Sequence, residues 1–220
     1  MFTPIALEKL RVGVLQYPSM GNFACQQPTI DKTIRRLNRR GVLTKNIQAN
    51  FSKISRFKES FVACTEFKFF LSKYLSDMPN QPIKSLEDVV DFNNKHPEIY
   101  KGQNQEYLKV AQMTSGLDDL IYLDNLKQNQ DDASRLIKHL LKEHCLDALI
   151  TPSHPDLYSQ FPAAVAGYPI LTLPIGIAEH GDPFGLSIYS DWGKEHVLYS
   201  IAHHMDPTSS ARQPPHFLNS

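Results

Sequence analysis

The sequence lacks the features that mark membrane proteins, secreted disulfide-rich proteins and polyanion-binding proteins. Its three cysteines, Cys25, Cys64 and Cys145, are odd in number and far apart, which argues against a disulfide framework or a zinc cluster. No apolar run approaches the ~18 residues that span a bilayer, and the N-terminal residues carry charges where a signal peptide needs an apolar stretch. The 23 Lys and Arg residues balance 23 Asp and Glu residues, so no net field attracts nucleic acid. We therefore expect a cytoplasmic protein with reduced thiols, no membrane span and no nucleic-acid partner.

The chain is long enough for one well-packed domain. A chain of 220 residues buries roughly 70% of the surface that its unfolded form exposes. We expect this domain to cover residues 1–206. Residues 207–220 are rich in proline and serine and are expected to form an extended tail.

A strand and then a helix are expected near the N-terminus. Leu10, Val12 and Val14 alternate with Arg11 and Gly13, which is the two-residue period of a strand. The apolar residues that follow have helical spacing and end at a glycine, as a helix does; they are Ile30, Ile34, Leu37 and Gly41.

The end of this helix carries four arginines, Arg35, Arg36, Arg39 and Arg40. Such a cluster could bind phosphate or nucleic acid. Cations near a helix C-terminus also complement the helix dipole, and we interpret this cluster as a solvated face.

The middle of the chain is expected to be helical. Phe57 to Leu75 has apolar residues at helical spacing, and we interpret this stripe as core; it consists of Phe61, Cys64, Phe67, Leu71 and Tyr74. Ser85, with Asp88 three residues later, has the pattern of a helix N-cap, and the helix is expected to run to about Asn93. A further helical pattern covers residues 103–126.

The C-terminal third alternates helices and strands. We expect helices over 131–144, 162–167 and 197–205, and strands over 146–150, 170–173 and 184–188. Thr151 with Pro152, and later Pro174, are expected to end the strands before them, because proline cannot donate to a central ladder. The order predicts an α/β fold with a mixed β-sheet flanked by helices.

Several residue pairs imitate catalytic or metal sites without forming one. His139 and His144 are five residues apart and do not share a helix face. Cys145 follows His144, but we expect it to open a buried strand as a structural cysteine. The pairs Asp118-Asp119 and Asp131-Asp132 are best explained as helix-start acids. We therefore expect no metal site and no cofactor.

Four blocks, in this order and at this spacing, resemble the C-terminal part of amidase-signature hydrolases. They are LDALITPS (146–153), FPAAVAGYPILTLPIG (161–176), GDPFGLSIYSDW (181–192) and QPPHFL (213–218). The resemblance covers nearly the whole chain and implies an incomplete amidase-signature fold, with residues 1–206 as a partial amidase domain. It also implies hydrolysis of carbon-nitrogen amide bonds by a Ser-cisSer-Lys triad.

The triad of that family is missing from the sequence. In the family, the lysine and the glycine- and serine-rich loop lie in the N-terminal half, and these 220 residues contain no GGSSGG-like segment. The serines of Thr208 to Arg212 lie in the tail without glycines, and Met113 to Gly116 is a helix stop. No catalytic residue is therefore assigned in this chain.

The resemblance implies a role in substrate binding for four residues, Thr151, Phe161, Val165 and Tyr168. In the family, the segments that carry them approach the active-site cavity. Each is also explained by core packing, which we favour. Trp192 is expected either to line a pocket or to pack on the last helix.

Three functions remain open. The chain is a truncated amidase-family member that is inactive on its own, which we favour, or one half of a split hydrolase complemented by an N-terminal amidase half, or a noncatalytic module that binds a small amide ligand. A sheet without its N-terminal strands is expected to expose an edge and an apolar face, which lowers stability or invites a partner.

Overall fold

The structure is a computed structural model of the chain, and it describes residues 4–16, 27–48, 56–100, 105–153, 161–177, 181 and 183–205. The chain divides into two compact units. The sheet unit contains residues 1–53 and 131–220, and the helical unit contains residues 54–130. The tail expected over 207–220 lies outside the described residues.

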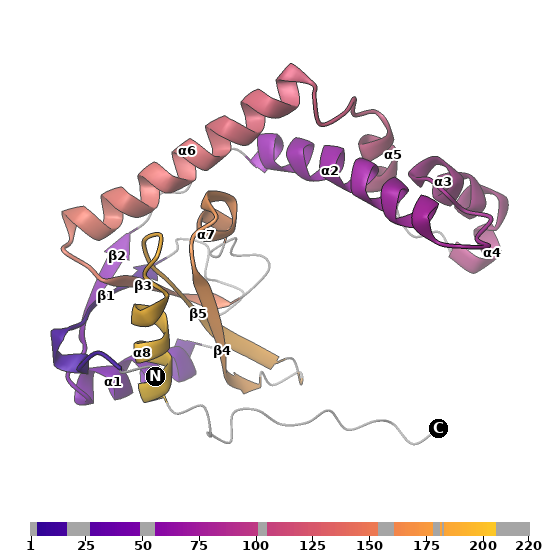
Figure 1. The fold of residues 1–220 in the computed structure, drawn as a ribbon. Coiled ribbons are helices and arrows are strands. Elements are labelled where there is room, and N and C mark those ends of the chain that lie inside the picture. The colour runs from indigo at the N-terminus through magenta and orange to yellow at the C-terminus, as the bar shows by residue number, and fades with distance from the viewer. Residues whose placement is uncertain are drawn as a thin grey trace. The chain divides into compact units, whose positions relative to one another are not determined.

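The sheet unit is built on a mixed five-stranded sheet with the strand order β2-β1-β3-β5-β4 (Figure 1). Strand β1 pairs in parallel with β2 and β3, while β5 pairs antiparallel with β3 and β4. This arrangement confirms the predicted α/β class and mixed sheet. The strands are β1 (Arg11–Gln16), β2 (Leu43–Gln48), β3 (Ala148–Ser153), β4 (Ile170–Ile177) and β5 (Pro183–Tyr189).

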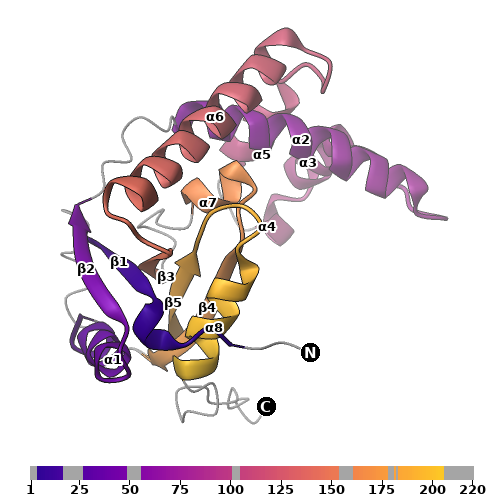
Figure 2. The same ribbon diagram turned by 60° about the vertical axis from the view of Figure 1, so that its left-hand side comes forward.

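Helices cover both faces of this sheet (Figure 2). On one face, α1 (Gln27–Arg39), α8 (Glu195–Met205) and the short 3-10 helix η1 (Leu7–Lys9) pack against Val12, Ile150 and Ile188. On the other, α7 (Phe161–Ala166) and the end of α6 (Leu120–Glu143) pack against Leu149 and Tyr189. The expectation of an uncovered apolar sheet face is therefore wrong for these five strands, because both faces carry a buried cluster.

Strand β2 was not predicted from the sequence. Of its six residues, only Ile47 is buried, and Thr44, Lys45 and Asn46 give it no alternating apolar pattern. It lies at the edge of the sheet, beside β1 alone, where polar side chains face water. Its place is fixed by α1, which crosses from the end of β1 to the parallel β2.

Both prolines that were expected to end strands lie inside them. β3 continues through Pro152 to Ser153, and its recorded pairing with β1 stops at Ile150, so no parallel ladder continues beside the proline. β4 continues through Pro174 to Ile177, with an irregularity in its register beyond the proline. β4 is an edge strand, and proline is tolerated at edges and bulges.

The helical unit contains α2 (Arg56–Asp77), α3 (Leu86–Lys95), α4 (Pro97–Tyr100), α5 (Glu106–Gln112) and the first part of α6. The helical pattern expected over 103–126 is broken between α5 and α6. α6 begins at Leu120 rather than at Asp131, so Asp131 and Asp132 lie inside a helix and do not start one. Asp119 does act as a helix-start acid, since its carboxylate accepts a hydrogen bond from the Ile121 backbone N–H at 2.7 Å.

The stripe of α2 that was expected to be core is buried only in part. Phe67 and Tyr74 are 43% and 62% exposed, while Cys64 is buried against α3 and α5. The buried face also includes Val62 and Thr65, so the core-facing side is rotated away from Phe67 and Tyr74. Aromatic size predicted burial here, and the packing of the short helices decided otherwise.

The cap predicted at Ser85 is confirmed. Its hydroxyl accepts a hydrogen bond from the Asp88 backbone N–H at 3.1 Å. The Asp88 carboxylate accepts in turn from the Lys84 backbone N–H at 2.8 Å. This backbone bond is the main reason why the pKa of Asp88 lies below its ordinary value. The start of α3 was thus readable from four residues of sequence.

Acidification is expected to destabilise the sheet unit through His204 on α8. Desolvation, followed by the nearby His203 and Arg40, lowers the pKa of His204 below its ordinary value. The folded state therefore favours the neutral imidazole, and the stability that this provides is present above about pH 6.5 and is lost as the pH falls. In urea denaturation followed by circular dichroism, His204→Gln should lose less stability than the wild type between about pH 7.5 and about pH 5. Equal losses in the two proteins would contradict the prediction.

Candidate functional site

Hydroxyl side chains gather on one face of the sheet at the carboxyl end of β3. Thr151 and Ser153 are two residues apart on β3, so they point to the same face. Ser187 on β5 lies opposite Thr151, and Thr172 on β4 lies opposite Ser187. The strand register thus brings together residues from three strands. We call these four residues, Thr151, Ser153, Thr172 and Ser187, the hydroxyl cluster.

Three hydrogen bonds connect Ser153, Thr172 and Ser187. Ser187 Oγ lies 2.5 Å from Ser153 Oγ and 2.7 Å from Thr172 Oγ1, and Ser153 Oγ lies 3.5 Å from Thr172 Oγ1. Ser187 and Thr151 are fully buried, Ser153 is half-buried, and Thr172 is exposed. The group therefore runs from the interior of the sheet to its surface at β4.

The chemistry that the hydroxyl cluster offers is hydrogen bonding. A hydroxyl both donates and accepts, so it can bind the carbonyl oxygen and the N–H of an amide. A serine acts as a nucleophile only when a base activates it, and the group's own members are all hydroxyls. The arrangement is suited to holding a polar ligand and supplies no base of its own.

The four predicted substrate-binding residues occupy different surroundings. Thr151 belongs to the hydroxyl cluster. Tyr168 is 8% exposed, and its hydroxyl lies 2.7 Å from Ser134 Oγ on α6. Val165 is half-buried on α7, and Phe161 is the first residue of that helix, with a side chain outside the described ones. Their role in substrate binding stays a prediction.

Sequence reasoning did not find Ser153, Thr172 and Ser187. Each one alone is an ordinary strand hydroxyl. The signal that could have found them is parity, because Thr151 and Ser153 share one face of β3 and Ser187 alternates with apolar residues on β5. The register between distant strands is needed to complete the group.

Of the residues considered as substitutes for a triad, Thr208 to Arg212 lie outside the described residues, and those that the structure describes form no triad. Cys145 is exposed and has a φ of +51° in the turn after α6, so the expectation that it opens a buried strand is wrong. Thr114 Oγ1 donates to the Ala111 carbonyl at 2.7 Å, which is a helix-end contact. Lys68 Nζ donates to the Gln112 and Thr114 carbonyls at 2.8 and 2.5 Å, at the end of α5. Trp192 is 75% exposed, so it does not pack on the last helix as one expectation had it.

The described ranges contain neither a metal-binding cluster nor a membrane-spanning helix. Among those residues, no group of three or more His, Cys, Asp or Glu side chains could hold a metal ion. No helix in the described part of the chain is both long and apolar enough to cross a bilayer.

The chain is similar over most of its length to proteins of known name or structure. It is 31% identical over 162 residues to the Arabidopsis thaliana protein named Probable amidase, a match of 73% of this chain and 31% of that protein. The crystal structure of peptide amidase from Stenotrophomonas maltophilia superposes on 96% of this chain and 45% of that chain, with a TM-score of 0.77 and 32% identity. A shorter match, 30% identical over 115 residues, joins 43% of this chain to 22% of a glutamyl-tRNA(Gln) amidotransferase subunit from Clostridium botulinum. No family model matches the chain.

The chain thus spans less than half the length of these relatives. The superposition accounts for the mixed five-stranded sheet and its helices, which have the amidase-signature α/β fold.

Proposed function

Because this chain belongs to the amidase family, we propose that it forms one side of the substrate site of an amide-bond hydrolase and does not hydrolyse amides by itself. The nucleophile and base of the family's triad would then lie outside these 220 residues. In this interpretation the chain is a truncated family member.

One observation carries the proposal. The chain superposes over 96% of its length on only 45% of the peptide amidase. The serine- and glycine-rich loop that the family's triad needs is absent from all 220 residues of the sequence. The chain retains the fold of the family but lacks the segment that carries the nucleophile. This combination supports a role in shaping the substrate site and not in the chemical step.

The ligand that we propose is a small amide, such as a peptide with a C-terminal amide. The name of the peptide amidase supports this class of ligand, and so does the hydroxyl cluster. Thr172, at the exposed end of that group, would hydrogen-bond the amide, and the buried Ser187 would hold Thr172 and Ser153 in place.

The purified chain is expected to react with no fluorophosphonate probe and to release no ammonia from a peptide amide. The reason is that the sequence lacks the serine- and glycine-rich loop that the family's triad needs. Mass spectrometry of the probe-treated, folded protein makes the measurement, with an active serine hydrolase as the positive control. Covalent labelling of a serine that heat denaturation abolishes would overturn the proposal.

A split hydrolase is the second candidate. The amidotransferase relative is named as one subunit of its enzyme. A partner that carries the lysine and the serine-rich loop would restore activity when it is co-purified with this chain. Activity that appears only in the mixture would favour this candidate over a noncatalytic binding module.

A further inference from the structure

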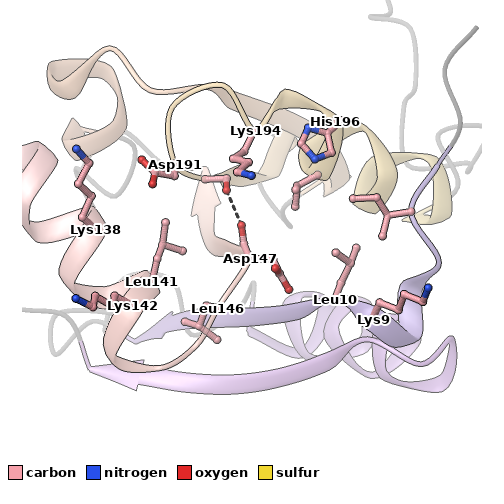
Figure 3. Close-up of a pocket in the computed structure, with 13 residues that line it drawn as sticks. Lys9, Leu10, Lys138, Leu141, Lys142, Leu146, Asp147, Asp191, Lys194 and His196 are labelled. Atoms are coloured by element: carbon pink, nitrogen blue, oxygen red, sulfur yellow. Dashed lines mark hydrogen bonds between the residues drawn. The ribbon is translucent and has the colours of Figure 1, made fainter.

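A cavity lies at the start of β3, at the opposite end of that strand from the hydroxyl cluster. Its volume is about 540 Å³, and all of its lining residues belong to the sheet unit. Leu146 and Asp147 precede β3, while Ser190 and Asp191 follow β5. The segment before β1, the last turns of α6 and the start of α8 complete the lining (Figure 3).

The floor of this cavity is apolar. Leu10, Leu141 and Val197 are buried, with 2%, 7% and 5% of their surface exposed, and they line the cavity together with Ile5 and Leu146. Aliphatic side chains on such a floor favour an apolar ligand group over water.

The rim of the cavity is basic. Lys138 and Lys142 extend from the end of α6, Lys9 lies on the other side, and Lys194 points towards the middle (Figure 3). All four lysines are exposed, and none of their ammonium groups has a hydrogen bond or ion pair with another residue in the described ranges. His196 adds an imidazole at the start of α8, whose N-terminal end carries the positive pole of the helix dipole.

The two carboxylates of the lining are held by backbone groups. The Arg11 backbone N–H donates to Asp147 Oδ2 at 2.8 Å, and the Trp192 backbone N–H donates to Asp191 Oδ1 at 2.8 Å. Apart from His196, four lysines and two aspartates leave a formal excess of two positive charges. Ser190 Oγ also donates to the Asp147 carbonyl, which ties the two sides of the cavity together.

We propose that this cavity binds a small organic anion that has an apolar body and one carboxylate or phosphate head group. The apolar floor takes the body, and the rim lysines take the head group. The volume lies within the range of about 300 to 1,000 Å³ that is typical of small-molecule sites. Because the hydroxyl cluster lies at the other end of β3, this site does not depend on the proposed amidase function.

The test is isothermal titration of the purified chain with 4-phenylbutyrate and with phenyl phosphate, at low ionic strength. We expect saturable binding of one or both, weakened by added salt. The double variant Lys138→Gln/Lys194→Gln should weaken binding about ten-fold, since it removes two of the four lysine charges on the rim. The uncharged 4-phenylbutanol should bind more weakly than 4-phenylbutyrate does.

The matched control is Lys32→Gln, which removes an exposed lysine of α1 outside the cavity lining. It should leave binding unchanged. Both changes replace exposed side chains, so folding should be preserved, and circular dichroism checks this. No saturable binding of either probe up to about 10 mM, or equal weakening by the control and the double variant, would overturn the proposal.

Discussion

Replacing Ile150 by alanine is expected to lower the free energy of unfolding of the sheet unit by about 2 to 5 kcal/mol. Ile150 is fully buried in the central strand β3, where it lies opposite Val14 on one side and Ile188 on the other. Helices α1 and α8 cover it through the same buried cluster. The loss combines the transfer of the removed methyl groups with the cavity left between the strands and these helices. Urea denaturation followed by far-UV circular dichroism measures it.

Ile177→Ala is the matched control for this change. Ile177 lies at the end of the edge strand β4 and is 42% exposed, so the same truncation there should cost less than about 1 kcal/mol. Similar losses at the two positions would mean that β3 is not the centre of the sheet unit's core.

The strands and helices whose apolar residues follow a strong periodic pattern could be predicted from the sequence. β1, β5 and α8 were found because their apolar residues follow a strict period, and the structure buries those residues. β2 could not be found in this way. Its stability comes from pairing with β1 and from the α1 crossover, so its own residues carry little information.

The proline errors have one physical cause. A proline removes one backbone donor, and the consequence depends on whether a neighbouring strand needs that donor. The pairing of β1 with β3 ends at Ile150, before Pro152, and Pro174 lies on an edge strand. The position of a strand within its sheet is a tertiary property, which the local sequence does not contain.

The same reasoning explains how much of the candidate site was predictable. Thr151 was singled out because the family resemblance places its segment near the substrate. Ser153 and Ser187 became part of the site only through the register of β3 with β5, which joins residues far apart in the chain. Register follows from which face of each strand is buried, and that requires the whole sheet.

Replacing Tyr168 by alanine is the second change with a large expected effect, a loss of about 3 to 5 kcal/mol in the free energy of unfolding. Tyr168 is 8% exposed and packs in the cluster between the sheet, α6 and α7. Its backbone N–H also donates to the Ala163 carbonyl at the end of α7, while Gly167, just before it, has a φ of +68°. The ring therefore fills the space to which the turn after α7 directs it.

The hydroxyl of Tyr168 separates packing from ligand binding. Tyr168→Phe keeps the ring and removes the 2.7 Å hydrogen bond with Ser134 Oγ, which should cost about 1 kcal/mol. Tyr107→Ala, at a position that is 77% exposed, should change stability by less than about 0.5 kcal/mol. Denaturation of the three variants makes the comparison. If Tyr168→Phe instead left stability unchanged and abolished the binding of a peptide amide, the hydroxyl would belong to the substrate site, and packing would not be its main role. We expect the stability loss, because a buried hydroxyl that is already bonded to α6 holds that helix against the sheet and has one fewer bond to offer a ligand.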